Sequence, residues 1–173
     1  SGCKESEVFE LLETIKPVRG RMELAATRRN GASVYVDYAH TPEAIEVALK
    51  SLKPHILGKL IVIIGAGGER DEGKRPLMGL AAEKNSDFVI ITDDNPRNED
   101  PELIHQMIKN GIKDKNKVMV IGDRAEAILK AVDLLGVGDC LLIAGKGHET
   151  EQFIGENIFP FDDFEQASLS VSS

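Results

Sequence analysis

Five consecutive residues combine side chains that suit the binding of a small carboxylate. They read Asp93-Asp94-Asn95-Pro96-Arg97 and directly follow the short apolar run 88–92. That run predicts a buried strand, so the polar residues would leave its carboxyl end, where open α/β sheets bind their ligands. An arginine meets a carboxylate as a planar two-pronged donor, the asparagine adds a side-chain amide, and the proline stiffens the turn. The stretch therefore predicts a site for a specific small ligand.

A second polar loop, Gly145-Lys146-Gly147-His148-Glu149, follows the apolar run 140–144. Its histidine suits either ligand binding or a backbone hydrogen bond that shapes the loop, and the sequence favours neither role. Asp94 of the first loop has a similar alternative, which is to hold its own loop by accepting hydrogen bonds from backbone amides. Both loops are therefore candidates for the same site, with alternatives open for these two residues.

The glycine-rich stretch 65–75 allows two further interpretations, and each has a defect. As a dinucleotide fingerprint it has Arg70 at the third glycine position. As a phosphate loop it has Arg75 in place of the Ser or Thr that should hold magnesium, and three acids within it suit phosphates poorly. For the glycines alone, a flexible turn between strand and helix is favoured. Arg70 favours a ligand-binding role for this loop, because we expect it at the same sheet edge as Arg97.

We consider two further pairs of polar residues as candidate site residues. Asp37 and His40 follow the apolar run 33–36 and could face a nucleotide, although spacing alone favours a simple lead into a helix capped by Thr41. His55 and His105 have no obvious partners in the sequence, and we predict that both are surface residues.

Alternating strands and helices would bring the candidate loops together. We expect strands over 22–26, 33–36, 60–64, 88–92, 118–121 and 140–144. We expect helices over 8–15, 42–52, 75–84, 101–110 and 123–135, with a last short helix after 159–163. Near-continuous apolar strands separated by helices are typical of a parallel sheet covered on both faces. Because the loops 65–75, 93–97 and 145–149 all leave carboxyl ends of strands, they should line one edge.

The prediction for the fold is therefore an α/β class, Rossmann-like three-layer domain with a mostly parallel sheet. An antiparallel edge would come from the first two strands, which the turn signal Asn30-Gly31 joins. We predict that residues 1–18 are the end of a linker or a preceding helix, and that residues 19–173 form the domain.

The composition argues against several classes of protein. The chain has 173 residues, 42% hydrophobic and 29% charged, and a net charge of −8. An acidic chain with few aromatic residues argues against nucleic acid as a partner, and no apolar stretch is long enough to cross a membrane. Cys3 and Cys140 form no metal-binding pattern and are expected to be reduced thiols in a cytoplasmic protein. We predict no metal site.

Taken together, the motifs resemble the carboxyl-terminal domain of the Mur ligases over nearly the whole chain. Within that family, the chain is most similar to the ligases that add diaminopimelate to UDP-N-acetylmuramoyl-L-alanyl-D-glutamate. The matching stretches are Gly20-Arg21-Met22-Glu23, Asp37-Tyr38-Ala39-His40-Thr41-Pro42, Gly67-Gly68-Glu69-Arg70-Asp71, Gly73-Lys74-Arg75-Pro76-Leu77-Met78, Asp94-Asn95-Pro96-Arg97 and Gly145-Lys146-Gly147-His148-Glu149. Any one of them alone would be weak evidence, but the set is highly specific.

The resemblance implies a function and a set of residues. In the family, Asp-Asn-Pro-Arg recognises meso-diaminopimelate rather than lysine. The implied contacts with this amino acid are Arg70, Asp94, Asn95, Pro96, Arg97, Gly145 and Glu149, and the implied nucleotide contacts are Arg21, Asp37 and His40. ATP and Mg²⁺ would serve the full-length enzyme, with none certain for this chain. The UDP-MurNAc-dipeptide and ATP would be held mainly by other domains, so we expect no catalytic residue and no ligase activity in this chain alone.

Two departures from the family pattern stand out. Phe164 lies where family members often have arginine, which leaves the role of the tail open. The chain also has no intact Gly-x-x-x-x-Gly-Lys-Ser/Thr loop, which in the family belongs to a separate central domain. Two alternatives stay open at this point, a ligase relative that adds lysine and a dinucleotide-binding module that is not a ligase. Arg97 disfavours the first, and Arg70 disfavours the second.

Overall fold

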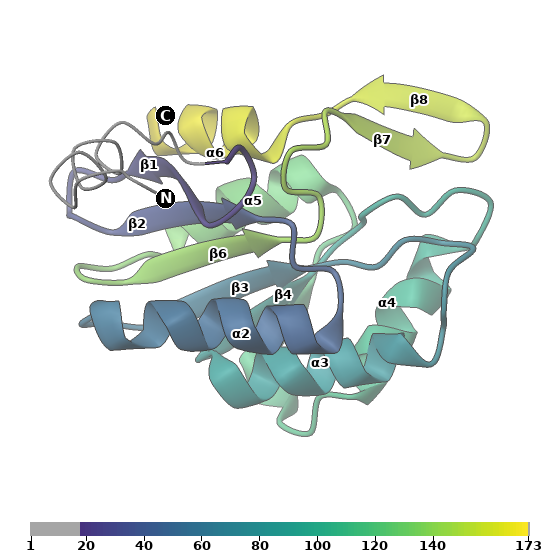
Figure 1. Cartoon of the computed structure of the whole chain (residues 1–173), viewed down its shortest axis with the longest axis horizontal. Helices are drawn as coiled ribbons and strands as arrows, with labels where there is room; N and C mark the ends of the chain where they lie inside the picture. The colour runs from purple at the N-terminus through teal and green to yellow at the C-terminus, as the bar shows by residue number, and fades with distance from the viewer. Residues whose placement is uncertain (1–17, 173) are drawn as a thin grey trace, which may run out of the picture.

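A six-stranded, mostly parallel sheet forms the centre of the protein (Figure 1). The computed structural model describes residues 18–172, so the helix expected over 8–15 and most of the predicted linker lie outside the described residues. The strand order is β1-β2-β6-β3-β4-β5, in which β1 is antiparallel to β2 and the other neighbours are parallel. The strands are β1 Glu23–Thr27, β2 Ser33–Asp37, β3 Leu60–Ile64, β4 Phe88–Ile91, β5 Val118–Val120 and β6 Cys140–Ala144.

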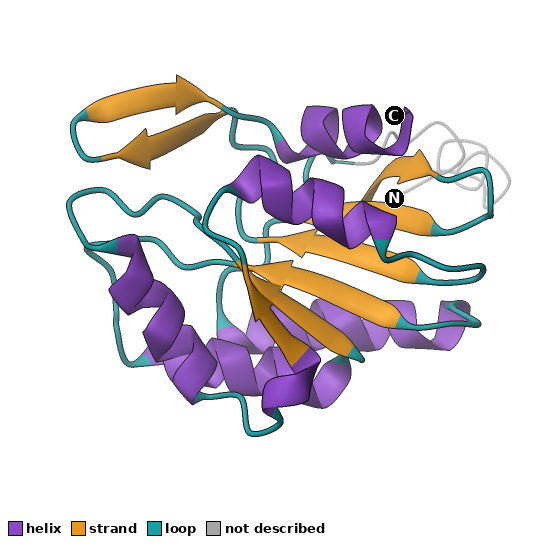
Figure 2. Cartoon of the chain, turned by 180° about the vertical axis from the view of Figure 1, so that it is seen from behind, coloured by secondary structure: helices purple, strands orange, loops and turns teal. Residues whose placement is uncertain are grey.

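Helices cover both faces of this sheet, which confirms the predicted three-layer α/β fold. One face packs against α2 (Pro42–Leu52), α3 (Lys74–Asn85) and α4 (Pro101–Asn110), and the other against α5 (Arg124–Asp133) and α6 (Asp163–Ser172) (Figures 1 and 2). Short 3₁₀ turns follow α2 (Lys53–His55) and precede β5 (Lys115–Lys117).

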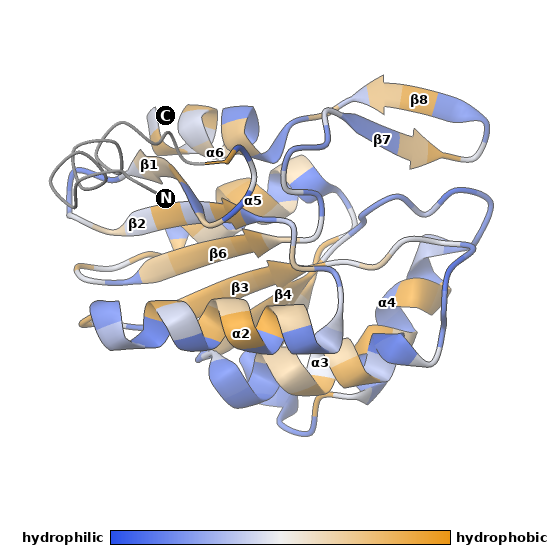
Figure 3. Cartoon of the chain, in the orientation of Figure 1, coloured by the Kyte–Doolittle hydropathy of each residue, from blue (hydrophilic) through white to orange (hydrophobic). Residues whose placement is uncertain are grey.

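The central position of β3 in the sheet explains why its sequence is apolar at every residue instead of alternating. All five of its residues are buried, because successive side chains enter the two opposite cores of the molecule. Leu60, Val62 and Ile64 join the core under α2 and α3, whereas Ile61 and Ile63 join the core under α5. In Figure 3 the central strands β3, β4 and β6 are coloured as hydrophobic, whereas the helices around them carry hydrophilic and hydrophobic residues in turn.

Three helices begin at the side-chain caps that the sequence suggests. Thr41 accepts a hydrogen bond from the Ala44 amide, Asp100 from the Glu102 amide, and Asp123 from the Glu126 amide. By contrast, α3 begins after Gly73 without a side-chain cap, directly behind the glycine-rich loop. Within residues 18–172, no helix has both the length and the apolar character needed to cross a membrane.

A second, two-stranded sheet was not predicted from the sequence. Strands β7 (Glu151–Ile154) and β8 (Asn157–Pro160) form a hairpin that projects beyond the main sheet (Figure 1). The hairpin turns at Gly155, which has a φ of +58°. Phe161 packs against the core under α5 before α6 begins, whereas Phe159 and Pro160 belong to the exposed strand β8.

Candidate functional site

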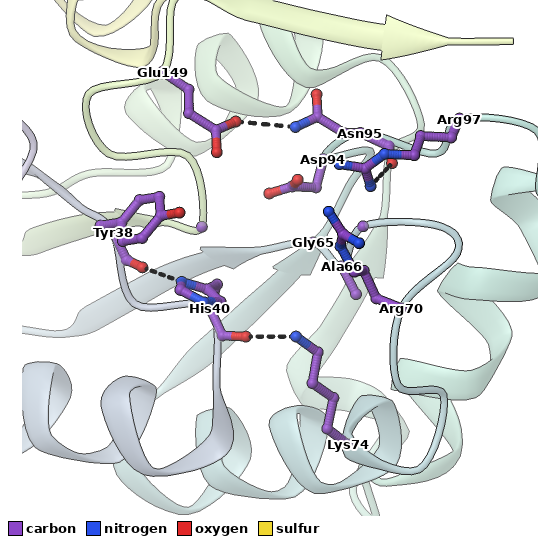
Figure 4. A pocket seen from close by; sticks show the side chains of 12 residues that line it. Tyr38, His40, Gly65, Ala66, Arg70, Lys74, Asp94, Asn95, Arg97 and Glu149 are labelled. Atoms are coloured by element: carbon purple, nitrogen blue, oxygen red, sulfur yellow. Dashed lines mark hydrogen bonds between the residues drawn. The ribbon is translucent and has the colours of Figure 1, made fainter.

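The carboxyl ends of β2, β3, β4 and β6 surround a cavity of about 190 Å³ (Figure 4). Strand β6 lies between β2 and β3 although it follows both in the chain, so this edge contains a topological switch point of the kind where α/β sheets bind ligands. The three loops expected to meet at one edge all contribute to the cavity. Its lining comprises Tyr38, His40, Gly65, Ala66, Gly67, Arg70, Lys74, Asp94, Asn95, Arg97, Gly145 and Glu149.

Two guanidinium groups approach the same side of the cavity. A side-chain carbon built on Gly67 would lie 3.0 Å from Nη1 of Arg97 and 3.6 Å from Cγ of Arg70, so both arginines lie beside this glycine. Nη1 of Arg97 donates to the Gly68 carbonyl at 2.9 Å. Within residues 18–172 we find no hydrogen bond from the Arg70 side chain, which is exposed. The pair therefore offers free donors for an anionic group.

The unpredicted hairpin shapes the loop that presents Arg97. The Arg97 amide donates to the Phe153 carbonyl at 3.0 Å, and the Gly155 amide donates to the Arg97 carbonyl at 2.7 Å. These bonds hold Arg97 at a φ of +54°, a left-handed conformation that is uncommon for a residue with a side chain. Pro96 is buried behind the loop and does not line the cavity. The hairpin thus fixes a strained backbone that no local sequence signal specifies.

The carboxylate of Glu149 lies across the cavity from the arginines, and the side-chain amide of Asn95, which is next to Arg97, reaches toward it (Figure 4). Nδ2 of Asn95 donates to Oε2 of Glu149 at 2.9 Å, which joins the loops after β4 and β6. Oδ1 of Asn95 accepts a hydrogen bond from the Phe153 amide at 3.1 Å. The cavity therefore has a cationic side and an anionic side.

Asp94 adds a second carboxylate, and its environment is unusual. Burial raises the pKa of the Asp94 carboxyl, and the positive charges of Arg124 and Lys146 only partly oppose this effect. No amide donates to this carboxylate among the described residues, so the structure does not support the alternative that Asp94 holds its own loop. Gly145 lies against it with a φ of +116°, and a side-chain carbon at Gly145 would be 2.7 Å from Oδ2 of Asp94.

This environment predicts that Asp94→Asn stabilises the protein at neutral pH. A carboxyl group whose pKa is raised by folding contributes stability below its unfolded pKa and loses it as pH rises through the folded value. The melting temperature of Asp94→Asn should therefore exceed that of the wild type near pH 7, and the difference should shrink as the pH falls and be largely lost below about pH 4, where the carboxyl is protonated in both states. Thermal unfolding of both proteins across this pH range measures the difference in melting temperature. An equal or lower melting temperature at neutral pH would show that the carboxylate supports the fold.

The predicted nucleotide contacts gather around Tyr38. The Arg21 guanidinium lies 4.6 Å from the centre of the Tyr38 ring, and the His40 ring packs against the same ring edge-to-face. Asp37 lies nearby, but its two oxygens accept hydrogen bonds from the Met22 and Ala39 amides. The structure therefore leaves Arg21 and His40 exposed at the rim, whereas the Asp37 carboxylate is engaged by the backbone. His148 is also exposed, with its ring 5.3 Å from that of Tyr38.

A buried arginine that the sequence analysis missed ties the loop bases together. Arg124 forms a two-pronged ion pair with Asp163, with N···O distances of 2.7 Å and both side chains fully buried. It also donates to the carbonyls of Asp93 and Ala144, at the ends of β4 and β6. The tail therefore supports the site through Asp163, the residue before Phe164.

The prediction that His105 is a surface residue is wrong, whereas His55 is exposed as expected. His105 lies beside the apolar positions Ile104 and Ile108 of α4, and Nε2 is 2.7 Å from Oδ1 of Asp93. The histidine packs behind the loop rather than into the cavity. Its partner is distant in sequence, so helical spacing alone gave no sign of the contact.

Among the described residues, no group of three or more His, Cys, Asp or Glu side chains is arranged to hold a metal ion.

Comparisons with known proteins show that the chain is similar to members of one protein family. Residues 20–147 match the family model described as "Mur ligase, glutamate ligase domain". Two similar curated proteins are named UDP-N-acetylmuramoyl-L-alanyl-D-glutamate–2,6-diaminopimelate ligase. The one from Bradyrhizobium diazoefficiens is 48% identical over all of this chain and 35% of its own length, and the one from Coxiella burnetii is 50% identical over 92% of this chain and 32% of its length.

A solved structure of a ligase with the same name superimposes with a TM-score of 0.84. It is 38% identical, and the match covers 99% of this chain and 35% of that one. The chain thus spans about a third of the length of the relatives that it matches.

Proposed function

The chain belongs to the Mur ligase family, and on that premise we propose that it is the amino-acid-binding domain of an ATP-dependent ligase. The ligase adds meso-diaminopimelate to UDP-N-acetylmuramoyl-L-alanyl-D-glutamate in peptidoglycan synthesis. One observation carries this proposal, the convergence of Arg70 and Arg97 on one side of a small cavity with Glu149 on the other. The distal end of meso-diaminopimelate carries both a carboxylate and an ammonium, which match those two sides.

Each predicted contact then has a chemical role. Arg97 and Arg70 bind the distal carboxylate as two-pronged donors, and Glu149 accepts from the distal ammonium. Asp94 adds negative charge for an ammonium, and Gly145 leaves room next to it because it has no side chain. Asn95 orients Glu149, and Pro96 supports the loop from behind. Lysine lacks the distal carboxylate, and its binding would leave the arginines without a partner.

The domain contributes position rather than a reacting group. In the reaction, the γ-carboxylate of D-glutamate is activated by ATP as an acyl phosphate. The free amine of meso-diaminopimelate attacks it, and the tetrahedral intermediate loses phosphate. Holding the amine in line with the acyl carbon makes this attack effectively unimolecular. We assign the reaction to the cytoplasm, where ATP is supplied.

For ATP, this chain offers Arg21 and His40 at the rim of the cavity. Their donors suit phosphate or ribose oxygens, with Asp37 bracing the backbone between them. The phosphate loop and the Mg²⁺ ligands belong to other parts of the ligase. Closure of this domain over ATP would bring the amine to the acyl phosphate in a hinge motion.

The proposal is tested with the full-length ligase and its three substrates. We expect ADP release and a product whose mass is that of the UDP-MurNAc-dipeptide plus one diaminopimelate residue. Omission of meso-diaminopimelate should leave the dipeptide unextended. A product that forms equally well with lysine, or no extension of the dipeptide at all, would overturn the proposal.

The chain on its own should not convert ATP to ADP, because its 173 residues contain no intact phosphate loop. The measurement is ADP formation with the dipeptide nucleotide and meso-diaminopimelate both present. Turnover that depends on the dipeptide would show that the chemistry resides in this domain, contrary to the division of roles described above.

A further inference from the structure

Lys146 is a fully buried lysine whose ammonium lies between the two ligand loops. Its Nζ lies 3.1 Å from Oδ1 of Asn95, 3.1 Å from Oε2 of Glu149 and 2.6 Å from the Glu151 carbonyl. An ammonium has three N–H donors, and these three acceptors use all of them. Lys146 also does not line the cavity. Any effect of this charge on a ligand must therefore pass through its neighbours.

The first neighbour is Asn95, whose amide orientation Lys146 helps to determine. Oδ1 of Asn95 faces two donors, the Lys146 ammonium and the Phe153 amide. A rotated amide would place its own N–H groups against both donors, so the observed orientation is favoured. Nδ2 must then face Glu149, to which it donates at 2.9 Å. Lys146 and the Phe153 amide together thus make Asn95 a donor toward Glu149.

The second neighbour is Glu149, which Lys146 and Asn95 hold from the same side. Both donate to Oε2, so one oxygen of the carboxylate is fully engaged. Figure 4 shows the other oxygen directed away from Asn95, toward the space between Tyr38 and Asp94. That oxygen is the one available to a ligand. Without Lys146, Asn95 would be oriented by the Phe153 amide alone, and Glu149 would be held by Nδ2 of Asn95 alone.

We propose that Lys146 is a positioning residue for amino-acid specificity, which fixes Asn95 and Glu149 so that one Glu149 oxygen accepts the distal ammonium of the substrate. This inference rests on the proposed function. It assigns to Lys146 an effect on the binding of the amino acid, and none on the binding of ATP or of the nucleotide-linked dipeptide. A buried lysine with a purely structural role would instead lower the active fraction, and thereby kcat, for all substrates alike.

The test measures KM for each substrate in the full-length ligase with Lys146→Met. We expect KM for meso-diaminopimelate to rise about 10- to 100-fold, the effect of losing hydrogen bonds to a charged group. KM for ATP and for the dipeptide nucleotide should stay near the wild-type values. Lys130→Met is the matched control, because Lys130 is an exposed lysine on α5, and all its constants should stay unchanged.

A double-substitution cycle separates positioning from general damage. If Lys146 acts through Glu149, Lys146→Met should raise KM for meso-diaminopimelate far less in a Glu149→Gln background than in the wild type. Should Lys146→Met fail to fold, Lys146→Gln keeps two donors without the charge and should give the same selective rise. Equal changes for all three substrates, or additive effects in the cycle, would overturn the proposal. Wild-type activity with meso-diaminopimelate tests the proposed function separately.

Discussion

Arg97→Ala should lower kcat/KM for meso-diaminopimelate by roughly 10²- to 10⁴-fold, the range for loss of a partner to a charged group in a site built on polar contacts. The guanidinium lines the cavity, and within residues 18–172 its hydrogen bonds use Nη1 alone, which leaves Nε and Nη2 as donors for the proposed carboxylate. Steady-state kinetics of the full-length ligase with meso-diaminopimelate and with lysine measure the effect.

The lysine reaction provides an internal control for Arg97→Ala. Lysine has no distal carboxylate, so its low rate should change little, and the preference for meso-diaminopimelate should collapse. Arg97→Lys keeps the charge but loses the two-pronged geometry and should recover only part of the activity. Arg29→Ala, at an exposed arginine in the turn between β1 and β2, should have no effect. An undiminished preference in Arg97→Ala would assign the recognition of the carboxylate to another residue.

Arg124→Met should lower the free energy of unfolding by about 3–5 kcal/mol, the typical result of removing one member of a buried ion pair. The substitution would leave the fully buried Asp163 carboxylate without its partner, and the Asp93 and Ala144 carbonyls without a donor. Chemical denaturation of this chain measures the change.

The double variant Arg124→Met/Asp163→Leu is the control for the ion pair. It removes both charges, so a large part of the lost stability should return. The loops at the ends of β4 and β6 would still lack the common anchor, and affinity for meso-diaminopimelate should stay low. A loss below about 1 kcal/mol in the single variant would place this pair among the weak ion pairs, and its structural role would be rejected.

The meeting of the three ligand loops could be predicted from sequence for a simple reason. Parallel strands present their carboxyl ends at one edge, so each polar loop after an apolar run had a determined place. The same reasoning located Arg70, Arg97 and Glu149 without any knowledge of their contacts. It could not show that Pro96 lies behind the loop, because the course of a loop depends on what packs against it.

The supports of the site were harder to find, because their partners are far apart in sequence. Lys146 and Asn95 are separated by 51 positions, and Arg124 and Asp163 by 39. A buried charge also resembles an exposed one in a single sequence. Only the structure shows that Lys146 and Arg124 are enclosed, as it shows for His105.

The hairpin β7–β8 was missed because its strands are short and β8 is exposed throughout. Such strands lack the apolar run that identifies a strand of the main sheet. The turn at Gly155, between two segments with isoleucine and phenylalanine, was the available signal. The missed hairpin is important for the site, since β7 fixes the backbone of Arg97.

The most direct test of the account is the ratio of kcat/KM for meso-diaminopimelate to that for lysine in the wild-type, full-length ligase. A site that binds the distal carboxylate through two arginines should favour meso-diaminopimelate by about 10⁴-fold, because bound lysine leaves both guanidinium groups without their partner. A ratio near one would contradict the account, since the arginine side of the cavity would then have no part in choosing the substrate.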